Sequence, residues 1–252
     1  MSMTDKVKNF RESEWVDTAR TVTYAVVIAL IIRAFLFQPF NIPSGSMIPT
    51  LLIGDYLFVS KFSYGYSKHS FPFSLPLFDG RVLASQPERG DVIVFKKPTD
   101  NKTDFIKRLV GLPGDEIQVR RGILHINGKP VKRERMEDFI EKSPSGDLRR
   151  YPQYRETLPN GVSYTTLDTD ANGYLDNTGV YKVPEGHYFM MGDNRDNSND
   201  SRVPSEVGYV PFENLVGRAE VIFFSTDGSA RIWEIWNWFS ATRWNCLFHE
   251  VD

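Results

Sequence analysis

The chain has 252 residues, 41% of them hydrophobic and 25% charged, so it is long and apolar enough to fold around a sizeable core. Thirty basic and 32 acidic side chains give a net charge of -2 at pH 7, a balance that argues against nucleic acid as a partner. The single cysteine excludes an internal disulfide and a cysteine-rich metal site.

The first clear pattern along the chain is an apolar stretch over residues 21–37, interrupted by Arg33. Its length is near the lower limit for crossing a hydrocarbon core of about 30 Å. Because Lys and Arg precede it, we predict a cytoplasmic segment over residues 1–20 and a transmembrane anchor over residues 21–38. A cleavable signal peptide is one alternative, but the bulky sequence FQPF follows where small residues should be. A buried helix of a soluble protein is another.

Beyond the anchor, apolar residues gather in short runs bounded by Gly, Pro, Asp or Asn, which is typical of β-strands. Asn127-Gly128 is a strong signal for a hairpin turn, because both positions tolerate positive φ. No long amphipathic helix pattern occurs between residues 45 and 225, which argues against a doubly wound α/β fold. We therefore predict a mainly β fold, with an antiparallel-sheet domain over residues 39–252. The runs are YLFVSKF, DVIVFKK, FIKRLVG, EIQVRRGILHINGKPV, HYFMMGD and AEVIFFS.

Two further regions differ from the predicted sheet in composition. Residues 132–180 are more polar and carry charged, Pro and Gly clusters, which indicates a β-rich cap subdomain inserted at about residues 116–184. Residues 231–244 hold four of the five tryptophans. That density is typical of a packed core or of a belt at a membrane interface, and the sequence leaves both open.

Motifs for nucleotide, zinc and α/β-hydrolase chemistry are absent from the sequence. Residues 168–173 match the first half of a calcium loop, but Gly179 stands where that loop needs a bidentate Glu. We interpret the segment as an Asx-rich turn. The histidines lack the spacing of metal ligands or of a catalytic triad; they are His69, His125, His187 and His249. The sequence thus predicts no metal and no cofactor.

A serine-bearing loop follows the anchor, framed by Pro43 and Pro49. Gly45 permits an unusual backbone conformation, and Ser44 and Ser46 lie two residues apart. One hydroxyl could therefore attack a substrate while the other points into the same pocket. Taken alone, the segment is more often a simple turn.

Lys107 and Arg108 interrupt an apolar run that reads as a strand. Alternation sends the two side chains to opposite faces, so one of them must point inward. Burial lowers the pKa of a lysine because the charged form loses hydration, and the neutral amine can then act as a base near pH 7. A surface lysine is the commoner interpretation of this pattern by itself.

A polar loop, MMGDNRDNSNDSR over residues 190–202, follows another predicted strand. Such a density of Asx and Ser residues can form a hydrogen-bond network that orients a catalytic side chain. By itself, the segment is a turn-rich loop or a false calcium site.

Taken together, these segments resemble the type I signal peptidases, membrane-bound Ser/Lys endopeptidases that remove signal peptides from exported proteins. The resemblance rests on the anchor, the Ser46 loop, RGDVIVFK at residues 89–96, the Lys107 segment and the GDNRDNSNDSR loop, within roughly residues 20–225. Because Lys107 rather than a histidine stands at the position of the base, the chain resembles the bacterial and organellar branch of this family. The resemblance implies a signal peptidase/LexA-like β fold and cleavage after a small residue, in an Ala-x-Ala-like context.

The resemblance also implies a role for each matching residue. Ser46 matches the nucleophile and Lys107 the general base, while the Ser44 hydroxyl and the Ser46 N–H match the oxyanion hole. Ser198 matches the hydroxyl that orients the lysine. The residues that match a supporting network are Gly192, Asp193, Asp200 and Arg202, and those expected to contact substrate are Phe40, Ile42 and Ile106.

The implied partners are signal-peptide-bearing preproteins, membrane lipid and the protein export machinery. The implied location is the bacterial cytoplasmic membrane, crossed once, with the catalytic domain on the periplasmic side. Three features depart from the family pattern: Phe105 replaces a common aromatic hydroxyl, residues 236–252 fit poorly, and one anchor segment is visible instead of two.

Two rival interpretations belong to other functional classes. A self-cleaving LexA-like repressor shares the Ser/Lys pair, but it needs a DNA-binding helical domain where this chain has an apolar stretch. A non-catalytic membrane-tethered scaffold could keep the fold, but it gains nothing from an inward lysine beside a serine loop.

Overall fold

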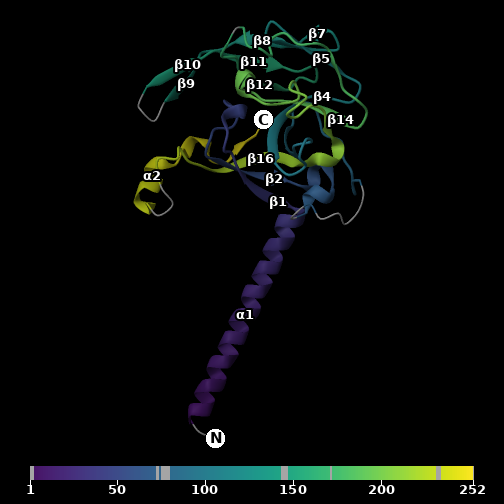
Figure 1. The fold of residues 1–252 in the computed structure, drawn as a ribbon. Coiled ribbons are helices and arrows are strands. Elements are labelled where there is room, and N and C mark those ends of the chain that lie inside the picture. The colour runs from purple at the N-terminus through teal and green to yellow at the C-terminus, as the bar shows by residue number, and fades with distance from the viewer. Residues whose placement is uncertain are drawn as a thin grey trace.

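A long helix projects from a β-rich domain (Figure 1). The structure is a computed structural model that describes residues 3–71, 74, 80–142, 147–170, 172–230 and 234–251. Within these ranges the α-helices are α1 (Met3–Phe35) and the short α2 (Trp238–Ala241). The mainly β fold predicted from the sequence is confirmed, as is the N-terminal apolar helix.

Helix α1 contains one segment, Trp15–Phe35, that is long and apolar enough to cross a membrane, and none of it is buried within the protein. Tyr24 and Ile28 are among its exposed side chains. The segment begins earlier than the predicted anchor, and the helix ends before residue 38, because the next residues pair with a strand instead. Apolar surface of this extent needs a covering other than water.

The central sheet starts directly after α1, with the strand order β1-β2-β16-β3-β4-β14-β15 and with β17 paired to β16. All of its pairings are antiparallel. Strands from the beginning and the end of the chain are neighbours in this order. The strands are β1 (Phe37–Asn41), β2 (Asp55–Ser60), β3 (Val92–Lys96), β4 (Asp104–Gly111), β14 (His187–Met191), β15 (Val210–Pro211), β16 (Leu215–Ser225) and β17 (His249–Glu250).

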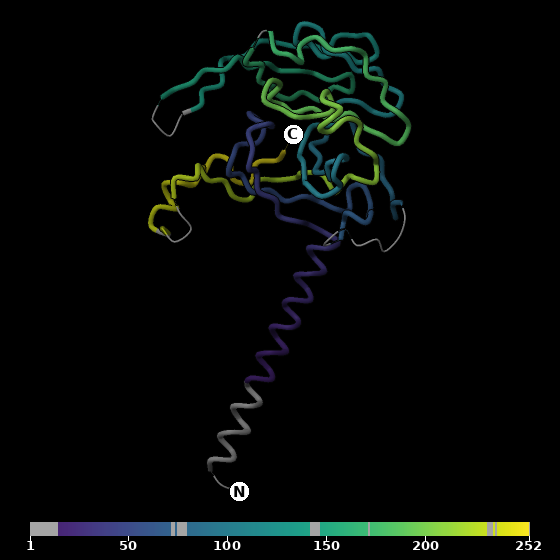
Figure 2. The backbone as a smooth tube through the Cα atoms, viewed as in Figure 1, coloured from purple at the N-terminus to yellow at the C-terminus, as the bar shows by residue number. Residues whose placement is uncertain are grey.

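The chain between β4 and β14 forms three small antiparallel sheets, drawn in teal and green in Figure 2. Their orders are β13-β5-β6-β7, β12-β11-β8 and β10-β9. The predicted hairpin is confirmed: Ile126 pairs with Lys129 across Asn127-Gly128, both of which have positive φ. The strands are β5 (Glu116–Arg120), β6 (Ile123–Ile126), β7 (Lys129–Pro130), β8 (Lys132–Arg135), β9 (Phe139–Lys142), β10 (Leu148–Tyr151), β11 (Gln153–Thr157), β12 (Ser163–Leu167) and β13 (Tyr181–Lys182).

Buried apolar side chains fix the serine loop on the sheet. Met47 and Leu51, on either side of the turn after Ser46, are completely buried. They belong to a core cluster with Leu57 of β2 and Val94 of β3. Burying side chains of this size contributes about 1.5–3 kcal/mol each, so the loop is anchored on the sheet from both sides.

The C-terminal region exposes large apolar side chains instead of packing them into a core. The exposed residues are Trp236, Trp238, Phe239, Trp244 and Phe248, whereas Trp233 lies outside the described residues. Exposed aromatic surface of this kind is typical of an interaction site.

The short 3-10 turns in the described part of the chain are η1 (Gly45–Met47), η2 (Phe62–Tyr64), η3 (Lys68–Ser70), η5 (Arg195–Asn197), η6 (Phe212–Asn214), η7 (Ile235–Asn237) and η8 (Trp244–Cys246).

Candidate active site

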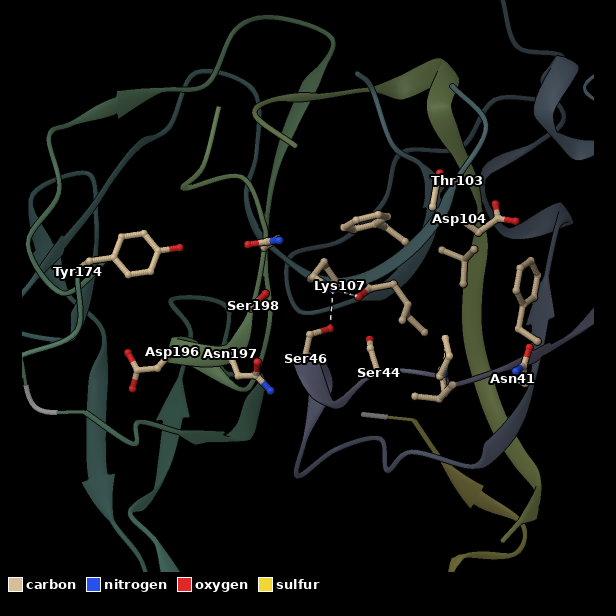
Figure 3. A pocket seen from close by; sticks show the side chains of 17 residues that line it. Asn41, Ser44, Ser46, Thr103, Asp104, Lys107, Tyr174, Asp196, Asn197 and Ser198 are labelled. Carbon is tan, nitrogen blue, oxygen red and sulfur yellow. Dashed lines mark hydrogen bonds between the residues drawn. The ribbon is translucent and has the colours of Figure 1, made fainter. Parts of the chain in front are cut away.

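Ser46 occupies the middle of turn η1 and is 8% exposed. Asn194 holds this turn from the opposite side: its backbone N–H donates to the Ser46 carbonyl at 3.1 Å, and its side-chain Nδ2 donates to the Gly45 carbonyl at 3.0 Å. The turn is thereby clamped between the sheet and the loop after β14. In this position the Ser46 hydroxyl faces Lys107 (Figure 3).

Lys107 projects from β4, where it pairs with Ile93 of β3, and it is 3% exposed. Its Nζ lies 2.7 Å from Ser46 Oγ and donates to the Ile106 carbonyl, also at 2.7 Å. Burial lowers the pKa of Lys107 to about 8, although Asp200 and Asp193 act in the opposite direction. A neutral amine at this distance can accept the proton of the hydroxyl.

Arg108 points to the other face of β4, as strand alternation predicts, but it is also completely buried. Its Nε and Nη2 donate to the two oxygens of Asp193 at 2.9 and 2.8 Å, and its Nη1 donates to the Gly90 carbonyl at 2.8 Å. The guanidinium carbon lies 4.2 Å from the centre of the Tyr164 ring. Tyr164 belongs to β12, so the inserted segment covers this face and both side chains point inward.

A second buried ion pair stands behind the serine and the lysine. Asp200 accepts from Arg202 Nη2 at 2.8 Å and from the Gly192 N–H at 3.0 Å. A Cβ on Gly192 would lie 2.2 Å from Ser198 Oγ and 2.6 Å from the Ser46 carbonyl oxygen. The close approach of these segments therefore requires glycine at position 192.

Ser198 lies beside Ser46 and Lys107 (Figure 3). The hydrogen bond expected between Ser198 and the lysine is not formed; Lys107 Nζ bonds to Ser46 and Ile106 instead. Ser198 Oγ is buried, and within the described part of the chain it has no hydrogen-bond partner. A lysine carrying three protons has one more donor than these two bonds use.

A cavity of about 600 Å³ opens beside Ser46 and Lys107. Each residue predicted to contact substrate lines it, and so do Ser44 and Ser198. The residues predicted to form the supporting network are buried and are not among the lining residues; they are Gly192, Asp193, Asp200 and Arg202. Taken as a whole, the walls of the cavity are more apolar than polar. The predicted residues that line the cavity are Phe40, Ile42, Ser44, Ser46, Ile106, Lys107 and Ser198, and further lining residues include Val94, Phe105, Tyr174, Asp196 and Asn197.

Several contacts of the site were not predicted. Thr50 donates to Asp193 at 2.5 Å, and Arg195 forms a buried ion pair with Glu156 of β11, with Nη1 to Oε1 at 2.8 Å. Asn194, which clamps the serine turn, was also not singled out. The sequence carries no local signal for these pairs, because each partner is distant along the chain.

Comparisons with known proteins identify the family of the chain. Residues 15–224 match the family described as "Signal peptidase, peptidase S26". A protein named Signal peptidase I from Rickettsia typhi is 47% identical over 212 residues, which is 81% of this chain and 78% of that protein. One of the same name from Rickettsia canadensis is 46% identical over 224 residues, 84% of this chain and 80% of that protein.

A solved signal peptidase I from Enterococcus faecalis is 28% identical, covers 53% of this chain and 97% of that chain, and has a TM-score of 0.31. The family match spans most of the chain and includes Ser46 and Lys107. The chain therefore belongs to the signal peptidase family, peptidase S26, whose members are serine endopeptidases that cleave signal peptides from preproteins.

Proposed function

We propose that this protein cleaves signal peptides from exported preproteins with Ser46 as the nucleophile and Lys107 as the general base. The observation that carries the proposal is the 2.7 Å separation of Lys107 Nζ and Ser46 Oγ beside a cavity large enough for a peptide segment. The burial of both groups supports it, because burial lowers the pKa of Lys107 to about 8 and so increases the fraction of neutral amine near pH 7.

The reaction proceeds in two steps. Neutral Lys107 accepts the proton of Ser46 as Oγ attacks the carbonyl carbon, and the resulting ammonium gives a proton to the amine of the departing mature protein. The signal peptide remains as an ester on Ser46. Water then attacks this ester as Lys107 accepts one of its protons, and the ammonium returns that proton to Ser46 Oγ as the ester bond breaks. The signal peptide leaves as a carboxylic acid that loses its proton to solvent.

The oxyanion of the tetrahedral intermediate needs donors close to Ser46. We assign this role to the Ser44 hydroxyl and the Ser46 backbone N–H, since Ser44 lines the cavity two residues from the nucleophile. One such donor typically contributes about 10²–10³-fold to kcat. We assign to Ser198 the third hydrogen bond of protonated Lys107, since its buried hydroxyl in the same cavity lacks another partner among the described residues.

Gly192, Asp193, Asp200 and Arg202 act as positioning residues in this proposal. The Arg108–Asp193 and Arg202–Asp200 pairs fix the strand that carries Lys107 and the loop that carries Ser198. Both carboxylates also moderate the effect of burial on the pKa of Lys107.

Cleavage after small residues follows from the cavity walls. Phe40, Ile42 and Ile106 line the cavity near Ser46, and Ile42 is 3% exposed, so it has little room to move. Such walls accept Ala at the first and third positions before the cut. A preprotein with Leu at the first of these positions should be cleaved at least about 100-fold more slowly by the detergent-solubilised protein.

The matched control for this experiment places Leu at the second position, between the two small residues. That substrate should be cleaved within a few-fold of the Ala-x-Ala preprotein, because the intervening side chain faces away from the pockets in an extended peptide. Equal cleavage of all three substrates would mean that these walls do not select the substrate.

We further propose that the protein crosses the bacterial cytoplasmic membrane once, with residues 1–20 in the cytoplasm and residues 39–252 on the periplasmic side. The basic residues before the apolar segment of α1 support this orientation. Lipid contact is supported by the exposed side chains of that segment and by the exposed C-terminal tryptophans. The proposed substrates place the protein beside the export machinery.

A further inference from the structure

Three carboxylates converge next to the cavity. They belong to Asp168 and Asp176, in the connection from β12 to β13, and to Asp196 in η5. Each offers one oxygen, and these oxygens lie within 4.8 Å of one another. Asp196 is two residues before Ser198 and is one of the residues that line the cavity (Figure 3).

Two of the three carboxylates are buried without full compensation. Asp168 is 9% exposed and Asp176 is 3% exposed. Asp168 Oδ1 and Asp176 Oδ2 are buried and, within the described residues, accept no hydrogen bond. Oxygens in this state favour a ligand that brings positive charge.

Few cationic side chains of the protein offset the negative charge of the three carboxylates. Among the ion pairs of the described residues, the cluster receives one guanidinium, with Arg133 Nη2 donating to Asp168 Oδ2 at 2.5 Å. Arg202, the other cation near Asp176, is already paired with Asp200. Asp196 Oδ2 accepts from neutral donors only: the backbone N–H groups of Thr169 and Asp170 at 2.7 and 2.9 Å, and the Thr169 hydroxyl at 3.2 Å. Three carboxylates thus share one cationic side chain.

We propose that Asp168, Asp176 and Asp196 bind a divalent cation of the Ca²⁺ type. An all-oxygen set selects a hard cation, and Ca²⁺ accepts about 6–8 oxygens in irregular geometry, so carbonyls and water can complete its shell. The sequence argued against a metal because Gly179 replaces the Glu of a calcium loop. The structure adds Asp196, which lies outside that loop, to Asp168 and to Asp176 at the ninth position of the loop. Asp170 is exposed and accepts the Asn172 N–H.

The cation ties the connection from β12 to β13 to the loop that carries Ser198. These segments already meet through the Thr169 N–H, which donates to Asp196 Oδ2. Tyr174, from the same connection, lines the cavity together with Asp196. Binding of Ca²⁺ therefore stiffens this wall of the cavity.

The test is Ca²⁺ binding to the full chain in detergent after removal of metals with EDTA, followed by calorimetric titration and thermal unfolding. CaCl2 should bind with a Kd below about 1 mM and raise the Tm progressively, because it binds the folded state. Asp176→Asn should weaken binding at least about tenfold. The matched control, Asp170→Asn, removes the same charge from the same connection but lies outside the cluster, and it should bind like the wild type.

Asp196→Asn provides a second, less buried variant in case Asp176→Asn fails to fold, and it should lose binding as well. No saturable binding by folded wild type up to about 10 mM Ca²⁺ would overturn the proposal, and so would equal weakening in Asp170→Asn. A stronger response to MgCl2 than to CaCl2 would overturn the calcium assignment. Because no preprotein is present, the outcome does not depend on the proposed peptidase mechanism.

Discussion

Replacing Ser46 or Lys107 by Ala should lower kcat/KM for preprotein cleavage by at least about 10⁴-fold. Ser46 supplies the attacking oxygen, and Lys107 is the group within 2.7 Å that can take its proton. Because the two act as one unit, the double variant should be hardly worse than either single variant. Single-turnover cleavage of an Ala-x-Ala preprotein in detergent measures all three.

Lys107→Met provides the folding control for this comparison. Burial lowers the pKa of Lys107 from 10.5 to about 8. At pH 7 the buried charged lysine therefore lowers the free energy of unfolding by roughly 3 kcal/mol. The destabilisation has its full size below pH 8, where Lys107 is protonated in both the folded and the unfolded chain. It declines between pH 8 and pH 10.5, because there the lysine is neutral in the folded chain and still protonated in the unfolded chain. Lys107→Met should therefore be inactive but at least as stable as the wild type at pH 7. Activity in a folded Lys107→Met protein would place the base elsewhere.

Replacing Arg108 by Met should lower the free energy of unfolding by about 3–5 kcal/mol. The change leaves the Asp193 carboxylate buried without its bidentate partner, on a side chain that is 1% exposed. Guanidinium unfolding of the detergent-solubilised protein, followed by tryptophan fluorescence, measures this loss. Cleavage activity should fall as well, because Asp193 lies in the loop that meets the Ser46 turn.

The matched control is Arg218→Met. The Arg218 side chain is 46% exposed and pairs with Glu220 at 3.0 Å, so its loss should cost about 1 kcal/mol or less. If both variants lose the same free energy of unfolding, the buried Arg108–Asp193 pair does not hold the site together.

Local patterns were sufficient to predict much of the fold. The turn at Asn127-Gly128 specifies its own hairpin, and the short Val- and Ile-rich runs gave the main strands. The order of strands in the sheet could not be predicted from such patterns. The pairing of β2 with β16 joins residues near positions 57 and 222, and no local pattern encodes which of several apolar runs will meet.

The candidate site was predictable where its residues match a family pattern, as for Ser46 and Lys107. The residues that hold Ser46 and Lys107 in place were harder to predict. Alternation along β4 separates Lys107 from Arg108, but it does not reveal that inserted strands cover the second face and bury Arg108 too. The Asn194 clamp and the convergence of Asp176 with Asp196 depend on loops whose paths are set by tertiary packing.

The pH dependence of cleavage tests the role of Lys107 most directly. Because only the neutral amine can accept the Ser46 proton, kcat/KM for an Ala-x-Ala preprotein should rise about tenfold per pH unit at low pH and level off above the lysine pKa of about 8. A profile that is flat from about pH 6 to about pH 10, or that falls through pH 8, would contradict a neutral lysine as the base.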